Sequence, residues 1–476
     1  MKVLLTGSNG YIGRRLKKRL LAQKDVHLRL FVRDRKTLTS KINRNIEAVE
    51  GDSFDKDKLR LALKDIDVAY YLIHSLNSKN YKELDKKSAQ NFIDIAEECN
   101  VKKIIYLGGL GVKNKDTSEH LLSRLETGEI LSSSSQVQTI WIRAGVIIGS
   151  GSTSFEIIRN ITEKLPIMTT PKWVDTKAQP IAVDDVISYL NESLYLKEKQ
   201  NVVIDIGCEQ LTYKEMMLQT AKALGLKRVV IPLPFLSINL SSYWLNLFTP
   251  VPFSIAKALI EGLKSEVIMQ NDNAQKYFPN IKPTKYLEAV KQAVIVIQQN
   301  QVISRWSDNL GKDWNKDHSK EIADAIYLDR KELDITLIDK EKVYASFISI
   351  GGKNGWFEFD FLWEIRGFLD KMIGGVGLKR GRRDQNNLRI GDSLDFWKVV
   401  DIKENERLLL FAQMKLPGSA WLEFKINDNK LIQTAYYYPK GLFGRIYWYT
   451  LVPIHYFVFK NMIGNIVKKA KKLQNS

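Results

Sequence analysis

After Met1 the chain reads Lys2-Val3-Leu4-Leu5-Thr6-Gly7-Ser8-Asn9-Gly10-Tyr11-Ile12-Gly13, an apolar run that ends in a turn with three glycines. Leucines follow at helical spacing, at positions 16, 20 and 21, with basic residues between them. An apolar run, a glycine turn and an amphipathic helix in this order predict a βα unit. A dinucleotide-binding fingerprint requires this context.

The glycine spacing is G-x-x-G-x-x-G, and each glycine has its own physical role. Gly7 permits the sharp turn out of the strand, Gly10 lets a pyrophosphate approach the backbone, and Gly13 lets the helix pack close to the strand. The helix N-terminus then offers free N–H groups to the phosphates. A βα turn without a ligand is the alternative. We assign cofactor binding to Gly7, Ser8, Asn9, Gly10, Tyr11, Ile12 and Gly13.

Strand and helix patterns alternate over the first half of the chain. Such alternation implies an α/β, Rossmann-type parallel sheet covered on both faces, whose ligands lie at the carboxyl ends of the strands. The predicted strands are 27–32, 46–49, 68–73, 103–107, 139–142 and 202–206, and the clearest predicted helices are 57–63, 81–99 and 120–132.

Polar side chains follow several of these predicted strands. Arg33 follows the second strand, and a guanidinium there suits a 2′-phosphate, so we expect NADP. NAD is the alternative, because Asp34 places an acidic residue next to Arg33, as enzymes that select NAD do at this strand end. After the third strand, the Asp52 carboxylate can accept a hydrogen bond from an adenine amino group. The other residues expected to bind the cofactor are Ser53, Ile73, His74, Gly108 and Arg124, with a structural role for His74 as the alternative.

The composition of the 476 residues is that of a globular protein with two or three domains. Two distant cysteines fit a reducing compartment, and a strand that begins at residue 2 leaves no room for a signal peptide, so we expect a cytoplasmic protein. The net charge is +18, but the basic clusters at 379–389 and 468–472 lack interleaved aromatics, so no nucleic-acid partner is expected. No cluster of ligand-type residues predicts a metal site.

These motifs resemble the extended and atypical short-chain dehydrogenase/reductase superfamily over roughly residues 1–295. The resemblance implies a Rossmann-type domain that binds NAD(P), followed by a smaller substrate region at about 150–295. It rests on Thr6-Gly7-x-x-Gly10-x-x-Gly13, Gly51-Asp52, Asn91, Arg143-Ala144-Gly145 and Gln179-Pro180-Ile181-Ala182-Val183-Asp184-Asp185-Val186.

The catalytic pattern of that superfamily, a serine and a Tyr-x-x-x-Lys motif, is not conserved in this sequence. By position, Gly109 replaces the serine, His120 the tyrosine and Arg124 the lysine. Arginine keeps its charge and cannot act as a base near neutral pH, whereas histidine can transfer a proton there. Either His120 is the acid/base, together with Ser123, or the usual carbonyl chemistry has been lost. The candidate catalytic residues are His120, Ser123 and Arg124.

Two stretches in the middle of the chain bear on the substrate region. Residues 149–154 form a small-residue loop that either faces the substrate or only connects two elements. Residues 231–252 combine four prolines with large apolar side chains. We interpret them as helices over the substrate cleft, with a partner surface or a membrane-contacting loop as alternatives.

The pattern changes after residue 301. Stretches near 335–350, 391–412 and 420–435 alternate with period two and predict antiparallel strands, with a hairpin turn at Asn427-Asp428-Asn429. A long helix over about 444–472 ends in a lysine-rich tail. We therefore place one domain at 1–300 and a separate α+β domain at 302–476.

Residues 302–476 resemble the SRPBCC/START-like domain found behind atypical members of the superfamily. The resemblance implies a helix-grip fold with an apolar pocket but no particular reaction. Arg380, Arg382 and Arg383 either hold an anion or are solvated. The resemblance is carried by Ile350-Gly351-Gly352, Gly355-Trp356, Leu362-Trp363-x-x-Arg366-Gly367, Gly374-Gly375-Val376-Gly377-Leu378-x-Arg380-Gly381-Arg382-Arg383, Gly391-Asp392, Asp395-Phe396-Trp397, Met414-Lys415-Leu416-Pro417-Gly418 and Tyr447-Trp448-Tyr449.

Three functions remain open at this point. The first is an NADPH-dependent oxidoreductase that acts on an apolar small molecule, with His120 as proton donor and Arg124 holding the cofactor. The second is a non-catalytic NAD(P)-binding sensor or accessory protein, similar to the nicotinamide-binding accessory subunit of respiratory complex I. The third is lipid handling at an anionic membrane surface, which the apolar C-terminal helix and its lysine tail suggest.

Overall fold

The computed structural model describes residues 1–35, 38, 46–74, 80–114, 117–170, 172–232, 261–262, 265–299, 302–303, 325–356, 360–372, 375, 377, 381–384 and 387–475. The chain divides into two compact units, Met1–Lys312 and Asp313–Ser476, which are described separately.

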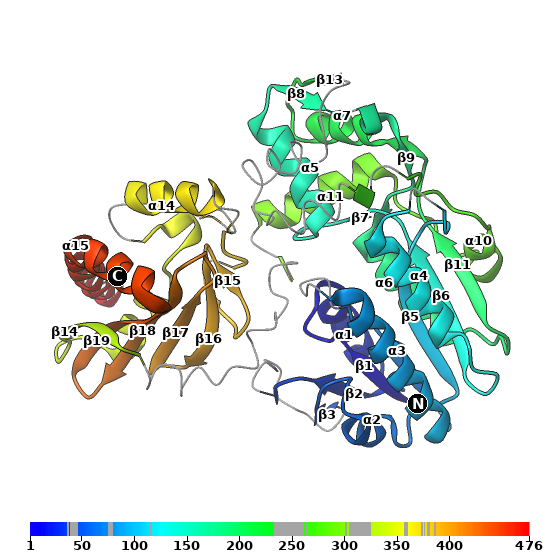
Figure 1. Ribbon diagram of the computed structural model, residues 1–476, viewed down its shortest axis with the longest axis horizontal. Helices are drawn as coiled ribbons and strands as arrows, with labels where there is room; N and C mark the ends of the chain where they lie inside the picture. The colour runs from blue at the N-terminus through cyan, green and yellow to red at the C-terminus, as the bar shows by residue number, and fades with distance from the viewer. Residues whose placement is uncertain are drawn as a thin grey trace. The chain divides into compact units, whose positions relative to one another are not determined.

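The first unit is built on a seven-stranded parallel sheet with the strand order β11-β6-β5-β4-β1-β2-β3 (Figure 1). This is a Rossmann-type sheet, as the alternating pattern predicted. The predicted strand positions are confirmed, and the boundaries of the strands differ from them by at most two residues. The strands are β1 (Lys2–Thr6), β2 (His27–Val32), β3 (Ile46–Glu50), β4 (Val68–Tyr71), β5 (Lys103–Gly109), β6 (Gln138–Ala144) and β11 (Val202–Ile206).

Helices cover both faces of this sheet, and each interface is a separate apolar core (Figure 1). One core packs α1 (Tyr11–Leu21), α6 (Val183–Ser193) and α10 (Asn273–Tyr277) against the strands. The other packs α2 (Lys56–Leu63), α3 (Tyr81–Glu98) and α4 (Glu119–Leu131). Because both faces are buried, the central strands are continuous apolar runs, which made them recognisable in the sequence.

A smaller region of the first unit has its own core. It contains α5 (Thr153–Lys164), α7 (Tyr213–Ala223) and α11 (Tyr286–Gln298). Thr212 and Glu215 form a capping box that begins α7. The remaining elements are β7 (Ile147–Ile148), β8 (Ile167–Thr170), η2 (Lys172–Asp175), β9 (Lys177–Ala178), β10 (Ile181–Ala182), β12 (Leu211–Thr212) and β13 (Val229–Pro232).

The second unit contains a six-stranded antiparallel sheet with the order β14-β19-β18-β17-β16-β15. Its core unites the sheet with α13 (Lys340–Ile348) and α15 (Gly441–Asn475). The hairpin turn is confirmed, because Asp428 adopts a positive φ of 52° between β18 and β19. The other elements are β14 (Tyr327–Asp334), η5 (Gly352–Asn354), α14 (Asp360–Met372), β15 (Ser393–Leu394), β16 (Trp397–Lys403), β17 (Arg407–Ala412), β18 (Gly418–Asn427) and β19 (Lys430–Pro439).

The prediction of strands over 335–350 is wrong, because residues 340–348 form α13. Val343 and Phe347, which are four residues apart, lie on the buried face of this helix. The edge strand instead covers 327–334. Most of its residues are charged, and most are exposed, so it lacks the apolar alternation that identifies a strand in the sequence.

Some expectations lie outside the described residues. They concern most of the apolar stretch 231–252, Pro171, the aromatic residues Phe357 and Phe359, and Arg380. Within the described part of the chain, no helix combines the length and the hydropathy needed to cross a bilayer.

Two helical glycines provide a test of the packing in the two units. A Cβ at Gly128 in α4 would lie 2.3 Å from the indole ring of Trp141, whereas one at Gly464 in α15 would meet nothing within 4 Å. We expect Gly128→Ala to destabilise the first unit by about 1–3 kcal/mol through overpacking. Gly464→Ala should stabilise the second unit by up to about 1 kcal/mol through helix propensity.

Urea unfolding of each unit measures both effects. Equal effects of the two substitutions would contradict the packing of Trp141 against α4.

Candidate functional site

The glycine turn between β1 and α1 lies against the end of β4. Gly7 has a φ of +64°, and a Cβ there would lie 2.5 Å from the carbonyl oxygen of Leu72. A Cβ at Gly13 would lie 2.1 Å from the carbonyl oxygen of Gly7, so helix and turn are in close contact. The Thr6 hydroxyl donates to Tyr70 O at 2.9 Å and accepts from Leu72 N at 3.0 Å, which joins β1 to β4.

The N-terminus of α1 is suited to an anion. No side chain caps its first N–H groups, and its first turn contains no acidic residue. The Ser8 hydroxyl is buried and has no partner among the described residues. These features fit the pyrophosphate of a dinucleotide, as the fingerprint predicts.

Two residues of the predicted fingerprint have local partners, Tyr11 through its ring and Asn9 through its backbone carbonyl. The Tyr11 ring lies under the Arg15 guanidinium at 4.2 Å, and Arg15 Nη2 donates to Ser150 O at 2.8 Å. Arg14 Nε donates to Asn9 O at 2.9 Å. These contacts connect α1 to the loop before α5, which belongs to the smaller region of this unit.

The residues predicted to bind the adenosine half lie at the ends of β2 and β3. Arg33 is exposed directly after β2. Asp52 Oδ1 accepts from Phe54 N at 3.1 Å, in a turn that leads into α2. Asn91 Nδ2 donates to Ser53 O at 3.2 Å and thereby fixes this turn to α3. Since β2 and β3 are adjacent parallel strands, their ends lie at the same edge of the sheet as the glycine turn.

One buried carboxylate joins two of the predicted site residues. Asp85 on α3 is 3% exposed, and its Oδ2 lies 2.7 Å from His74 Nδ1 and 3.3 Å from Ser123 Oγ. A carboxylate at this distance holds the proton of a neutral imidazole on Nδ1 and leaves Nε2 as an acceptor. His74 Nε2 is buried and has no partner in the described part of the chain.

His120 lies against His74, with 4.9 Å between the ring centroids. Burial lowers the pKa of His120 well below its usual value of 6.5, and His74 and the Arg124 charge lower it further. Burial also lowers the pKa of His74, although its hydrogen bond to Asp85 opposes this effect. Both imidazoles are therefore neutral at pH 7. Nδ1 of His120 is buried and, among the described residues, without a partner.

Arg124 is fixed beside the glycine that replaces the expected serine. Its Nη2 donates to Leu107 O at 2.5 Å, and its carbonyl oxygen accepts from the Tyr106 hydroxyl at 2.9 Å. A Cβ at Gly109 would lie 3.7 Å from Arg124 Nε and 2.8 Å from Leu121 Cδ1. Burial raises the pKa of Tyr106 to about 12, so this tyrosine cannot replace the missing one as an acid or base.

Gly108 has a packing role in addition to its predicted place at the cofactor. A Cβ there would lie 2.4 Å from Trp141 Nε1, so only glycine fits beneath that ring. The structure thus brings together His74, His120, Ser123 and Arg124, with Gly108 close by on β5. Arg33, Asp52 and Ser53 lie farther along the same sheet edge.

The sequence analysis did not find Asp85, the residue that holds this cluster together. Its position carried one signal. Asp85, Ser88, Ala89 and Phe92 share the buried face of α3, so a carboxylate lies at an otherwise small or apolar helix position. Nothing in the spacing showed that His74 or Ser123 would reach it.

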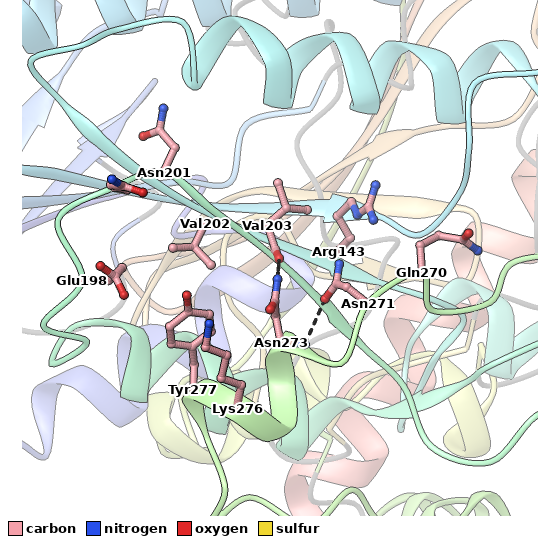
Figure 2. A pocket seen from close by; sticks show the side chains of 11 residues that line it. Arg143, Glu198, Asn201, Val202, Val203, Gln270, Asn271, Asn273, Lys276 and Tyr277 are labelled. Atoms are coloured by element: carbon pink, nitrogen blue, oxygen red, sulfur yellow. Dashed lines mark hydrogen bonds between the residues drawn. The ribbon is translucent and has the colours of Figure 1, made fainter.

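A polar recess of about 600 Å³ lies elsewhere in the first unit, along the edge strand β11 (Figure 2). Asn273 Nδ2 donates to Val203 O at 2.8 Å, and Asp205 N donates to Asn271 Oδ1 at 3.3 Å. These side chains satisfy backbone groups of the edge strand. The recess therefore has a structural explanation in protecting this edge.

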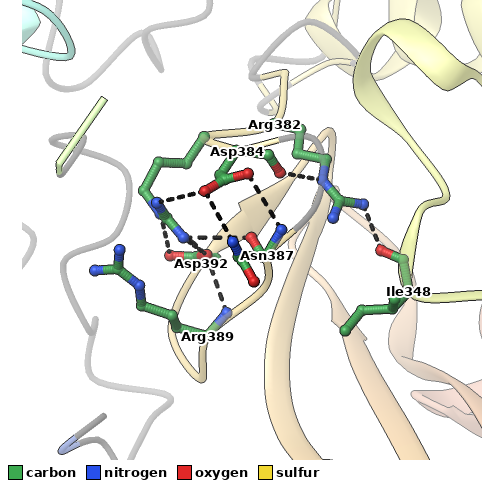
Figure 3. A network of polar contacts seen from close by, with 7 residues as sticks. Ile348, Arg382, Asp384, Asn387, Arg389 and Asp392 are labelled. Atoms are coloured by element: carbon green, nitrogen blue, oxygen red, sulfur yellow. Dashed lines mark hydrogen bonds and ion pairs between the residues drawn. The ribbon is translucent and has the colours of Figure 1, made fainter. Parts of the chain in front are cut away.

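In the second unit Arg382 and Arg383 are buried rather than solvated, and both bond to groups of their own unit (Figure 3). Arg383 is buried, and its Nη2 lies 3.2 Å from Oδ2 of the buried Asp392. Arg382 Nη1 donates to Ile348 O at 2.5 Å and to Ile350 O at 2.8 Å. Both guanidinium groups hold the loop to its own unit. Within the described residues, no group of three His, Cys, Asp or Glu side chains could hold a metal ion.

Comparisons with known proteins agree with this fold. Residues 7–145 match a family described as NAD(P)H-binding, and residues 322–462 match one described as a protein of unknown function (DUF2867). A comparison with curated protein sequences finds no significant match.

Two solved structures show the likeness of the fold. One is a nucleoside-diphosphate-sugar epimerase from Staphylococcus aureus, with 14% identity over 61% of this chain and 100% of that one, and a TM-score of 0.51. The other is the Citrobacter sp. triphenylmethane reductase complexed with NADP(H), with 19% identity over 62% of this chain and 100% of that one, and a TM-score of 0.51. The first unit thus has the Rossmann-type fold of these two structures, and its residues 7–145 match an NAD(P)H-binding family.

The lowered histidine pKa values predict how the stability of the first unit depends on pH. In the unfolded chain these histidines titrate near 6.5, so below that pH the unfolded state binds more protons than the folded state. Stability should therefore fall as the pH decreases from 6.5, by up to about 1.4 kcal/mol per pH unit for each histidine that stays neutral when folded.

His120→Gln should reduce this slope, and the same substitution at the exposed His27 should not. This slope is measured by unfolding the protein in urea at several pH values and monitoring the unfolding through hydrogen–deuterium exchange of first-unit peptides. An unchanged slope in His120→Gln would contradict the burial of His120 as a neutral ring.

Proposed function

We propose that the chain is an NADPH-dependent oxidoreductase of apolar carbonyl or enone compounds, with His120 in place of the usual tyrosine and Arg124 in place of the usual lysine. The observation that carries this proposal is the contact of two neutral, half-buried imidazoles beside the fingerprint turn, one of them hydrogen-bonded to the buried Asp85. Buried titratable groups with lowered pKa values and unpartnered nitrogens are typical of sites that transfer protons.

The residues have separate roles in this proposal. The bound dinucleotide supplies the hydride, while the protein supplies position and polarity. The fingerprint N–H groups and Ser8 hold the pyrophosphate. Arg124, which lies beside Gly109, holds the cofactor at that point of the site. His120, once protonated from solvent, donates this proton to the substrate oxygen and returns to its neutral form. His74, with its Nδ1 held by Asp85, keeps Nε2 as an acceptor beside this ring.

A non-catalytic NAD(P)-binding sensor or accessory protein is the second candidate. Two observations favour it. Gly109 has no side chain where the superfamily has its serine, and Arg124, which is expected to hold the cofactor, already donates one of its N–H groups to Leu107 O. Such a protein would bind NADPH without turning it over.

For the second unit we propose a helix-grip, SRPBCC-like fold that presents an apolar ligand. Support comes from a six-stranded antiparallel sheet that packs against the 35-residue helix α15 over an aromatic core. Aromatic side chains are suited to line such a site.

Turnover tests the first candidate against the second. The purified full-length chain is mixed with NADPH and a panel of apolar carbonyl and enone compounds, and nicotinamide absorbance is followed. We expect His120→Gln and Asp85→Asn to lower kcat by roughly 10²–10⁴-fold with little change in NADPH affinity. The reduction should slow by about tenfold per pH unit above pH 6.5, because the pKa of the donating imidazolium is lowered below that value and its protonated form becomes rarer as the pH rises.

His27→Gln is the matched control for these variants, because His27 is exposed at the start of β2. NADPH binding by wild type without turnover of any compound would contradict the oxidoreductase and support the sensor. Full activity in His120→Gln would contradict the role of His120.

The choice of cofactor has its own test. If Arg33 binds the 2′-phosphate, Arg33→Ala should weaken NADPH binding by roughly 10–100-fold and leave NADH binding unchanged. Arg35→Ala is the control, since the Arg35 guanidinium donates to Ala48 O. Titration of nucleotide fluorescence measures both, and equal effects on NADPH and NADH would indicate that NAD is the cofactor.

A further inference from the structure

The first half of α15 exposes large apolar and aromatic side chains to solvent. Phe443 is 80% exposed and Leu442 is 70% exposed. Isolated exposed apolar residues are ordinary, but a contiguous group indicates a surface that another phase or molecule covers. The group consists of Leu442, Phe443, Ile446, Tyr449, Tyr456 and Phe457.

This group continues onto the neighbouring sheet. A recess of about 350 Å³ is lined by Ile326, Tyr438 and Leu442 together with Arg445, so the start of α15 and the β14–β19 edge form one surface. Leu328 on β14 is 59% exposed and two residues from Ile326 on the same face of its strand. We call the six residues of α15, together with Ile326, Leu328 and Tyr438, the apolar patch.

The charge of α15 has a single sign. Residues 441–475 contain no aspartate or glutamate, and their cations are Arg445, Lys460, Lys468, Lys469, Lys471 and Lys472. The half-buried Lys469 donates to Ser349 Oγ at 2.6 Å, whereas Lys468, Lys471 and Lys472 are exposed.

The apolar and basic residues lie on the same face of the helix. At about 100° per residue, the six exposed apolar residues of α15, Lys460 and the tail lysines Lys468, Lys471 and Lys472 fall within one arc of about 160°. The buried residues Val458, Met462 and Ile466 fall on the other side. Along one exposed face, α15 therefore presents apolar and aromatic groups first and lysines afterwards.

We propose that this face of α15 binds the surface of an anionic lipid bilayer. Interfacial helices combine Phe, Leu and Tyr for the acyl boundary with Lys and Arg for the headgroups. The apolar patch would enter the boundary between headgroups and acyl chains, and the lysines would face lipid phosphates. A second copy of the chain is the less fitting occupant, because it would bring an equally basic helix.

The proposal goes beyond the oxidoreductase and does not depend on it. It gives the chain a location in which an apolar substrate is concentrated, and it can hold for a sensor as well.

Vesicle flotation of the full-length chain tests the proposal. Vesicles of phosphatidylcholine with about 30% phosphatidylserine should bind the protein at least about tenfold more strongly than pure phosphatidylcholine. Raising the salt from about 0.05 to about 0.5 M should weaken the binding. Lys468→Gln, Lys471→Gln and Lys472→Gln combined, or Phe443→Ser with Ile446→Ser, should each lower binding at least about tenfold.

Matched controls remove the same charge or apolar area elsewhere. They are Lys197→Gln, Lys199→Gln and Lys222→Gln combined, and Leu61→Ser with Leu337→Ser, all at exposed positions. The controls should bind as wild type does. No binding to the anionic vesicles, or equal losses in test and control variants, would overturn the proposal. So would a wild-type dimer that Phe443→Ser with Ile446→Ser dissociates without any change in vesicle binding, because a second copy would then cover the face.

Discussion

The carbonyl oxygen of Leu72 lies against the bare Cα of Gly7, and both parts of the candidate site depend on this approach. A Cβ at position 7 would lie 2.5 Å from that oxygen, and the Thr6 hydroxyl joins the same two strands by two hydrogen bonds. The close approach places the glycine turn next to the end of β4. His74 follows Leu72 by two residues, so the histidine pair is held at the same edge of the sheet.

The substitutions in the catalytic pattern are consistent with one another physically. His120 stands at the tyrosine position, and Arg124, which keeps its charge, cannot transfer a proton itself, so the imidazole is the remaining acid/base group in the proposal. Asp85 fixes the tautomer of His74, whose ring lies against that of His120. Gly109 leaves room for Leu121, which packs where a serine would stand.

Local patterns predicted the parallel sheet, because strands buried on both faces are apolar runs and the glycine spacing identifies the first turn. The same patterns wrongly predicted a strand at 340–348. Apolar and polar residues alternate there, but Val343 and Phe347 are four residues apart and lie on the buried face of a helix. Local patterns could not reveal Asp85, since its contacts join α3 to β4 and α4 across 11 and 38 residues. Similarly, the burial of Arg382 and Arg383 depends on partners that only the folded second unit brings near.

The central claim is that the fingerprint turn and the histidine pair form one working site. Long-range ¹H–¹⁵N NMR of ¹⁵N-histidine-labelled protein, recorded at pH 7 with and without NADPH, tests it most directly. The account predicts that His74 is a neutral Nδ1–H tautomer, that His120 is neutral, and that both sets of ring signals shift when NADPH is added. An imidazolium at either position, or ring signals that NADPH leaves unchanged, would contradict it.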